Sequence, residues 1–224
     1  MKKLITLMLS SMLVFSLTAC QGNTISETES KESHTKSVES SSKEQSKSKE
    51  SSNELSKEQS TKQKDNKSLV VYYSSTGNTK TVAKYIADET SSDLFELIPK
   101  ELYTNDDLNW NNKDSRVCIE HDNPDKRNVE LSSTTIDNWD SYDTVYIGYP
   151  IWWGIAAWPV NTFISANDFT GKTVIPFCTS ASSELGESGK LLAEMTGTGN
   201  WQEGKRFSSG ASKDDVVSWI DTIK

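Results

Sequence analysis

Short apolar runs alternate with helix-like stretches from Ser68 to the end of the chain. Leu69-Val70-Val71-Tyr72-Tyr73 is an uninterrupted apolar run, as expected of a strand buried on both faces of a parallel sheet. Strands that alternate with helices form right-handed crossovers, so that helices cover both faces of the sheet. The pattern predicts a doubly wound α/β domain over 68–224, with further strands at 94–98, 144–148 and 173–178 and helices at 80–90, 158–167, 187–195 and 213–223.

Residues 1–20 have the layout of a bacterial export signal. Lys2 and Lys3 precede an apolar run from Leu4 to Leu17, which is too short to span a bilayer comfortably. The run closes on Leu17-Thr18-Ala19-Cys20, which resembles the lipobox of bacterial lipoproteins. We therefore expect a lipid on Cys20, holding the protein on the extracytoplasmic face of the cell membrane. An ordinary signal peptide with a chance cysteine is the alternative.

Residues 21–67 have the composition of a flexible tether. They contain 13 Ser, nine Lys against nine Asp and Glu, and no Trp, Tyr or Phe. Without apolar surface to bury, such a segment cannot offset the conformational entropy that folding would remove. The sequence thus predicts three parts: a signal (1–20), a disordered spacer (21–67) and one folded domain (68–224).

Charge and cysteine usage exclude several classes of function. Residues 68–224 carry 13 Lys and Arg against 23 Asp and Glu, a net charge of −10, which repels nucleic-acid phosphates. His34 and His121 are the only histidines, and no Cys/His cluster has zinc-ligand spacing. Cys118 and Cys178 could form one disulfide, and spacing alone does not decide this. Because Cys178 closes an apolar strand-like run, a buried free thiol is favoured.

The turn after the first strand is suited to a phosphate group. It joins a buried strand to a helix, where the first backbone N–H groups lack partners and the helix dipole favours an anion. The turn contains neither Gly-x-Gly-x-x-Gly nor a lysine-bearing P-loop, which disfavours dinucleotides and nucleoside triphosphates. A polar turn capped by Asn78 or Thr76 is the alternative. The candidate residues are Ser74, Ser75, Thr76, Gly77, Asn78 and Thr79.

Three ordered motifs in residues 68–224 resemble the flavodoxin-like family. Tyr73 to Thr79 is similar to the flavodoxin phosphate loop, and Gly148 to Gly154 is similar to the flavin-flanking loop of a flavodoxin-like subfamily. Asp168 to Thr173, which leads to Phe177-Cys178-Thr179-Ser180, also resembles that subfamily. The resemblance implies a five-stranded parallel sheet in the order 2-1-3-4-5. It also implies one noncovalent FMN at the carboxyl ends of strands one, three and four.

The second and third motifs would hold the flavin ring. A flat, amphipathic ring needs apolar or aromatic faces and a few backbone hydrogen bonds, which Pro150, Ile151, Trp152, Trp153 and Gly154 can supply. We expect one of the two tryptophans to face the ring and the other to pack inward.

The third motif would place Thr179 and Ser180 near the polar edge of the ring. After it, the family's glycine-rich run is replaced by Ala181-Ser182-Ser183-Glu184. Added side chains there could narrow the pocket, and the Glu184 carboxylate would disfavour a reduced, anionic flavin.

The resemblance implies an electron carrier without catalytic side chains, whose chemistry belongs to the flavin. Its partner would be a redox protein or a small-molecule electron acceptor. Two alternatives remain, a flavin-dependent quinone or nitro-compound reductase and a surface binding module that lost the flavin. The acidic stretch from Asp106 to Asp125 is interpreted as a solvated loop in which Arg116 and Glu120 could pair.

Overall fold

A computed structural model of the chain describes residues 67–224. The predicted signal (1–20), its Cys20 and all but the last residue of the predicted tether (21–67) lie outside the described residues. Within 67–224, each helix is too short or too polar to cross a lipid bilayer.

The centre of the fold is a mainly parallel sheet. Its strands β1 (Lys67–Tyr72), β2 (Asp93–Glu96), β3 (Tyr142–Trp152) and β5 (Thr173–Ser180) stand in the order β2-β1-β3-β5. This agrees with the predicted order, and the α/β fold class is confirmed. The described residues form seven strands rather than five, however, because two short strands share the fifth position and a third short strand lies outside the predicted order.

Two of the short strands share the fifth position of the sheet. Strands β6 (Asn200–Trp201) and β7 (Lys205–Ser208) both pair parallel with β5, β6 before Pro176 and β7 after it. A proline has no N–H to donate, so it interrupts the ladder at that point. The third short strand, β4 (Ile155–Ala156), pairs antiparallel with the end of β3.

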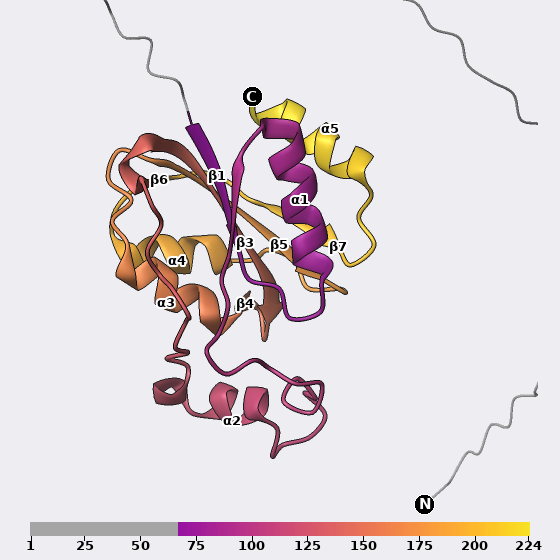
Figure 1. The fold of residues 1–224 in the computed structure, drawn as a ribbon. Helices are drawn as coiled ribbons and strands as arrows, with labels where there is room; N and C mark the ends of the chain where they lie inside the picture. Colours follow the sequence, from indigo (N-terminus) through magenta and orange to yellow (C-terminus); the bar gives the residue numbers. More distant parts are fainter. Residues whose placement is uncertain (1–66) are drawn as a thin grey trace, which may run out of the picture. The chain divides into compact units, whose positions relative to one another are not determined.

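Four helices cover the two faces of the sheet (Figure 1). One face carries α1 (Asn78–Thr90) and α5 (Lys213–Ile223), and the other carries α3 (Trp158–Ala166) and α4 (Ser188–Thr196). All four begin and end within two residues of the predicted bounds. Alternate residues of β1 point to opposite faces, so each side of the sheet has its own apolar cluster.

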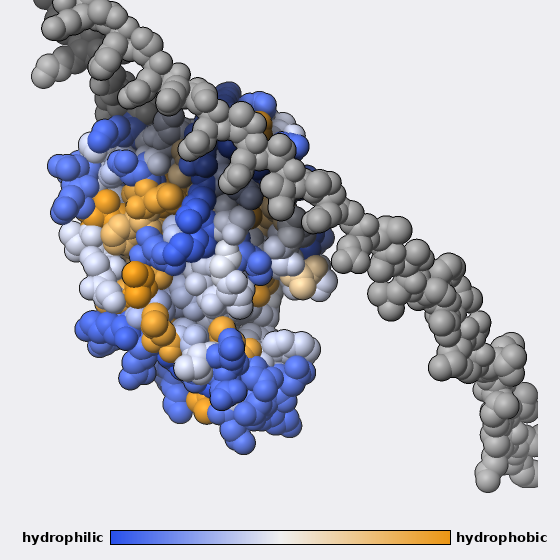
Figure 2. Space-filling model, turned by 45° about the vertical axis from the view of Figure 1, so that its right-hand side comes forward, coloured by the Kyte–Doolittle hydropathy of each residue, from blue (hydrophilic) through white to orange (hydrophobic). Residues whose placement is uncertain are grey.

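The long connection between β2 and β3 was predicted to be a solvated loop, and this is wrong for part of it. It contains α2 (Arg116–Asp122) and two 3₁₀ turns, η1 (Pro124–Lys126) and η2 (Trp139–Ser141). The part around α2 projects below the sheet in Figure 1, and Figure 2 shows that its visible surface is mostly hydrophilic. The helix was missed because the acidic residues around it suggested a solvated stretch.

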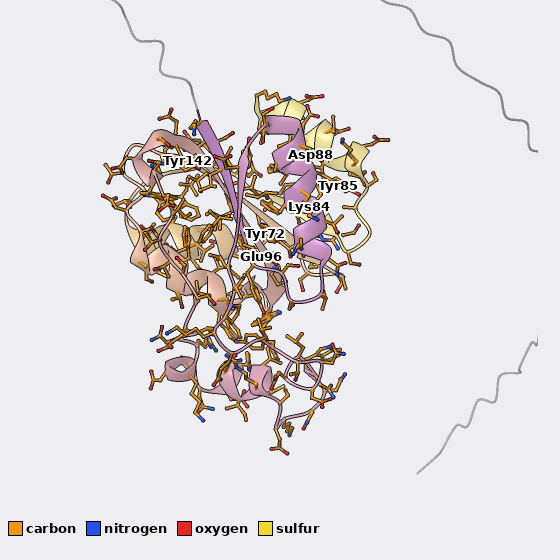
Figure 3. The ribbon with its side chains drawn as sticks, viewed as in Figure 1. Tyr72, Lys84, Tyr85, Asp88, Glu96 and Tyr142 are labelled. Atoms are coloured by element: carbon orange, nitrogen blue, oxygen red, sulfur yellow. The ribbon has the colours of Figure 1, made fainter. Side chains whose placement is uncertain are left out.

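The last two features of the fold concern the end of β2 and the two cysteines. The carboxylate of Glu96 accepts a hydrogen bond from the Tyr72 phenol at 3.0 Å (Figure 3). It also pairs with Lys80 at 2.7 Å, which ties the start of α1 to the end of β2. Cys118 and Cys178 are both buried and free, as favoured for Cys178.

Candidate functional site

The hydroxyl-rich loop lies between β1 and α1, as predicted. Gly77 is the N-cap of α1 and has a φ of 90°, a conformation that L side chains rarely adopt. Its N–H donates to Ser74 Oγ at 3.1 Å, and Asn78 Nδ2 donates to Thr76 Oγ1 at 3.3 Å. Neither Asn78 nor Thr76 caps the helix, so the capping alternative is wrong. The first turn of α1 therefore presents backbone N–H groups without a side-chain cap, a suitable place for an anion.

One of the predicted phosphate ligands has a different partner. The hydroxyl of Thr79 lies 2.7 Å from the hydroxyl of Thr179, and both side chains are buried. Thr179 belongs to β5, at the start of the third predicted loop. This contact brings two predicted site loops together, and it commits the Thr79 hydroxyl to the protein interior.

The second predicted loop is a tight hairpin. Trp152 of β3 pairs with Ile155 of β4, and the two residues between them have positive φ angles, 46° at Trp153 and 81° at Gly154. Positive φ at both central residues defines a type I′ turn, whose twist matches that of antiparallel strands. Glycine adopts this conformation easily, whereas a tryptophan there is strained.

The two tryptophans of the hairpin point to different surroundings. Trp152 is partly buried and makes edge contacts with Tyr73, Tyr103 and Trp158, at centroid distances of 5.8, 5.2 and 5.4 Å. Trp153 is 43% exposed and stacks on His121, with ring centroids 4.4 Å apart. Trp152 therefore packs inward and Trp153 lies at the surface, and the expectation that one of them faces the flavin ring stays a prediction.

The third loop is held by a residue that the sequence reasoning missed. Arg206 of β7 donates from Nε to Ser180 Oγ at 3.0 Å, and its Nη2 donates to the carbonyl oxygens of Ser180 and Ala181 at 3.1 and 3.0 Å. Residues 181–184 are exposed. Arg206 therefore places a positive charge beside the loop that ends in Glu184. Its strand is short and polar, and it gave no signal beyond the isolated apolar Phe207.

A cavity of about 350 Å³ lies where the second and third loops meet. Ile151, Trp152 and Trp153 line it on one side and 180–183 on another. The remaining lining comes from the connection between β2 and β3, through Leu108, Trp110 and Val117. These three residues were not predicted. The isolated Trp110 within a polar stretch is the one sequence signal that could have indicated them.

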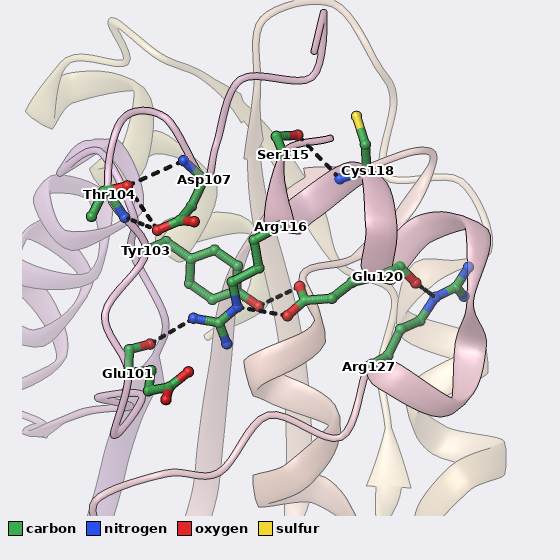
Figure 4. A network of polar contacts seen from close by, with 9 residues as sticks. All are labelled: Glu101, Tyr103, Thr104, Asp107, Ser115, Arg116, Cys118, Glu120 and Arg127. Carbon is green, nitrogen blue, oxygen red and sulfur yellow. Dashed lines mark hydrogen bonds and ion pairs between the residues drawn. The ribbon is translucent and has the colours of Figure 1, made fainter. Parts of the chain in front are cut away.

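The connection that supplies them is organised around Glu120 (Figure 4). This buried carboxylate pairs with Arg116 Nε at 2.7 Å, as suggested by their spacing, and accepts a hydrogen bond from the Tyr103 phenol at 2.6 Å. The Arg116 guanidinium also lies 3.9 Å from the centre of the Tyr103 ring and donates to the Glu101 carbonyl at 2.9 Å. Arg127 donates to the carbonyl oxygens of Glu120 and His121.

Two phenols and one thiol at or near the site have raised pKa values. Burial raises the pKa of the Tyr73 phenol above its usual value, and burial together with Glu120 raises the pKa of Tyr103. Burial also raises the pKa of the Cys178 thiol, to about 12. None of these three groups would be ionised near neutral pH, so none of them adds a negative charge here.

Comparison with known proteins gives a consistent match. The sequence model of the flavodoxin family matches residues 67–223. A candidate flavoprotein from Bacteroides uniformis, solved as a crystal structure, is 41% identical, with a TM-score of 0.65 over 70% of this chain and 98% of that one. A second, from Bacteroides eggerthii, is 39% identical, with a TM-score of 0.63 over 70% and 97%.

A more distant crystal structure was solved with its ligand. The flavoprotein of Lactobacillus acidophilus in complex with FMN is 26% identical, with a TM-score of 0.53 over 70% of this chain and 97% of that one. No curated protein matches the chain.

Proposed function

The chain belongs to the flavodoxin family, and on that premise we propose that it binds one FMN noncovalently and exchanges electrons through it. The observation that carries the proposal is that two different surfaces, one polar and one aromatic, lie at the carboxyl ends of neighbouring strands. The uncapped, hydroxyl-rich turn follows β1, and an aromatic cavity follows β3 and β5, joined by the contact between Thr79 and Thr179. A relative that is 26% identical was crystallised with FMN.

The turn fits the phosphate of FMN. Ser74, Ser75 and Thr76 carry hydroxyl groups, and the side chains of Ser75 and Thr76 keep contact with solvent. The backbone N–H groups at the start of α1 add donors and the positive end of the helix dipole. A Cβ at Gly77 would meet no atom within 4 Å, so this side of the turn is open. An anion can therefore approach the backbone closely.

The cavity fits the ring of FMN. Its walls are aromatic and apolar at Ile151, Trp152 and Trp153 and polar at 180–183. This combination suits an amphipathic plate, which needs flat apolar contact on its faces and hydrogen bonds at its edge. The volume of about 350 Å³ lies within the range of small-molecule sites. Arg206 fixes the polar wall by holding the carbonyl groups of Ser180 and Ala181.

Bound FMN supplies the electron-transfer chemistry, and the protein binds and orients it. Trp152 and Trp153 provide the aromatic wall against which the ring would pack, while Arg206 orders the third loop. Tyr73 and Tyr103 keep their protons because their pKa values are raised. The partner in this proposal is a redox protein or a small-molecule electron acceptor.

The experiment is a visible spectrum of the purified full chain, followed by FMN titration and reductive titration. We expect flavin absorbance and tight binding. Thr76→Asp places a carboxylate beside the phosphate and should weaken FMN binding by about a hundredfold or more, because two like charges would meet at close range. Ser91→Asp is the matched control, since it adds the same charge at the other end of α1, and binding should change by less than about threefold. A protein that stays colourless after FMN is added would refute the proposal.

We also propose that the protein is anchored through a lipid on Cys20 to the extracytoplasmic face of the cell membrane. The support is the apolar run that ends in Leu17-Thr18-Ala19-Cys20. Two or three acyl chains would hold the protein firmly, since each buried methylene contributes about 0.8 kcal/mol. Cys20→Ser should move the protein from the detergent phase to the aqueous phase on phase partition. Unchanged partition of this variant into detergent would contradict the anchor.

A further inference from the structure

The segment from Thr104 to Asp122, here called the cover segment, forms one wall of the candidate ring cavity. Leu108, Trp110 and Val117 line the cavity from this side, opposite the two loops that follow β3 and β5. Trp110 is 70% exposed, the highest exposure among the large hydrophobic side chains of residues 67–224. A large aromatic ring held at the edge of an aromatic cavity is typical of a residue that completes its contacts on a ligand.

The backbone that carries Trp110 is held in place by hydrogen bonds. The Cys118 thiol, which is buried, donates to the Trp110 carbonyl at 3.4 Å, and the Val117 N–H donates to the Asp107 carbonyl at 3.0 Å. Asp107 accepts bonds from the N–H and hydroxyl of Thr104 at 2.9 and 2.7 Å (Figure 4). The backbone at Trp110 is therefore held by the protein itself, which reduces the entropy lost on binding.

The cover segment is also fixed to the tryptophan wall across the cavity. Tyr103, which hydrogen-bonds the buried Glu120, packs its ring against Trp152 at 5.2 Å. At the same end of α2, His121, next to Glu120, stacks on Trp153 at 4.4 Å. Trp153 thus contacts the cover segment itself, and Trp152 contacts Tyr103, the residue that directly precedes it. The width of the cavity depends on these contacts rather than on a mobile loop.

From these contacts we infer that Trp110 is a ligand-contacting residue of the site, held by a preordered cover segment over the flavin ring. The inference rests on the proposed function and extends it to a residue outside the three family motifs. In this arrangement Trp110 contacts the ring end of the ligand and has no role at its phosphate. Its contribution is therefore the same for FMN and for riboflavin, which has the same ring but no phosphate.

The test compares FMN and riboflavin binding to the full chain and its variants by calorimetry. Trp110→Ala should weaken both ligands by the same factor, about fivefold to thirtyfold, which is the usual effect of losing one aromatic stacking partner. Trp110→Phe keeps an aromatic ring and should stay within about threefold of the native protein. Leu191→Ala is the matched control, because Leu191 is 42% exposed on α4 and does not line the cavity. It should change neither affinity.

Each result separates the inference from the function on which it rests. If Trp110→Ala binds both ligands as the native protein does, or weakens FMN alone, Trp110 does not contact the ring and the inference is wrong while FMN binding stands. If the native protein binds neither ligand, the proposed function and the inference both fail. Circular dichroism of Trp110→Ala should match that of the native chain because the side chain is mostly exposed.

Discussion

The hydroxyl groups of Thr79 and Thr179 meet in a buried contact of 2.7 Å, which joins the first turn of α1 to the end of β5. The two residues are 100 positions apart in the chain. Thr79 lies at the start of α1, where the phosphate loop ends, and Thr179 lies near the end of β5. The contact holds the phosphate loop and the third loop at a fixed separation. A ligand that reaches from one loop to the other depends on that separation.

This pair predicts a non-additive effect on stability. Thr79→Val or Thr179→Val alone leaves one buried hydroxyl without a partner, which should lower the free energy of unfolding by about 1–3 kcal/mol. The double variant removes both polar groups and keeps their shape, so most of that loss should be recovered. Urea unfolding of the four proteins measures the coupling. Losses that simply add would show that the two hydroxyls do not depend on each other.

The buried carboxylate of Glu120 predicts a large loss of stability on truncation. Glu120→Ala leaves the Arg116 guanidinium and the Tyr103 phenol without their shared partner, and the free energy of unfolding should fall by about 3 kcal/mol. Glu130→Ala is the control, because the pair of Glu130 with Lys100 is exposed and should contribute less than about 1 kcal/mol. Equal effects in urea unfolding would contradict the structural role of Glu120.

The strained turn at Trp153 predicts that stability and binding respond differently to one substitution. Asn followed by Gly is the preferred pair in a type I′ turn, so Trp153→Asn relieves strain at φ 46° while it loses the stacking on His121. The free energy of unfolding should change by less than about 1 kcal/mol, because these effects oppose each other. FMN affinity should fall by at least about fivefold.

Trp152→Asn provides the contrast for that substitution. Trp152 lies in a strand and packs against the core, so its loss should lower the free energy of unfolding by about 3 kcal/mol or more. Thermal and urea unfolding measure stability, and FMN titration measures binding. If Trp153→Asn proves as destabilising as Trp152→Asn, the two tryptophans do not divide the structural and binding roles.

The sequence predicted the parts of the fold whose signals are local. The uninterrupted apolar run Leu69–Tyr73 and the helical period of 80–90 are both local signals, and the structure places β1 and α1 there. Strands β6 and β7 were missed because they have two and four residues and are mostly polar. Their pairing is decided by β5 and its Pro176, far away in the chain.

The candidate site also divides into residues with a local sequence signal and residues without one. Its three motif loops are recognisable because each is a continuous stretch of chain, and the structure brings the second and third together at one cavity. Arg206 and Trp110 were missed because their roles depend on contacts with residues distant in sequence. Helix α2 did have local signals, a Ser115 N-cap and the Arg116–Glu120 spacing, but the surrounding acidic residues suggested solvent.

The buried phenols predict a loss of stability at alkaline pH. Burial, with the neighbouring Asp93 carboxylate that accepts its hydrogen bond at 2.7 Å, raises the pKa of Tyr142 to about 12, whereas a tyrosine in an unfolded chain has a pKa of about 10. Below pH 10 or so, both states hold the proton and this contribution to stability is complete. Between these two pKa values the unfolded chain loses the proton while the folded chain keeps it, so the free energy of unfolding falls.

Tyr142→Phe isolates this effect from the other tyrosines. The difference in unfolding free energy between the native protein and Tyr142→Phe should be constant up to about pH 9.5 and then shift against the native protein by up to about 1.4 kcal/mol per pH unit. Urea unfolding at a series of pH values gives this difference directly. Asp93→Asn, which removes the neighbouring charge, should narrow the pH range over which the shift occurs. A difference that stays constant through pH 12 or so would mean that the Tyr142 phenol titrates alike in both states.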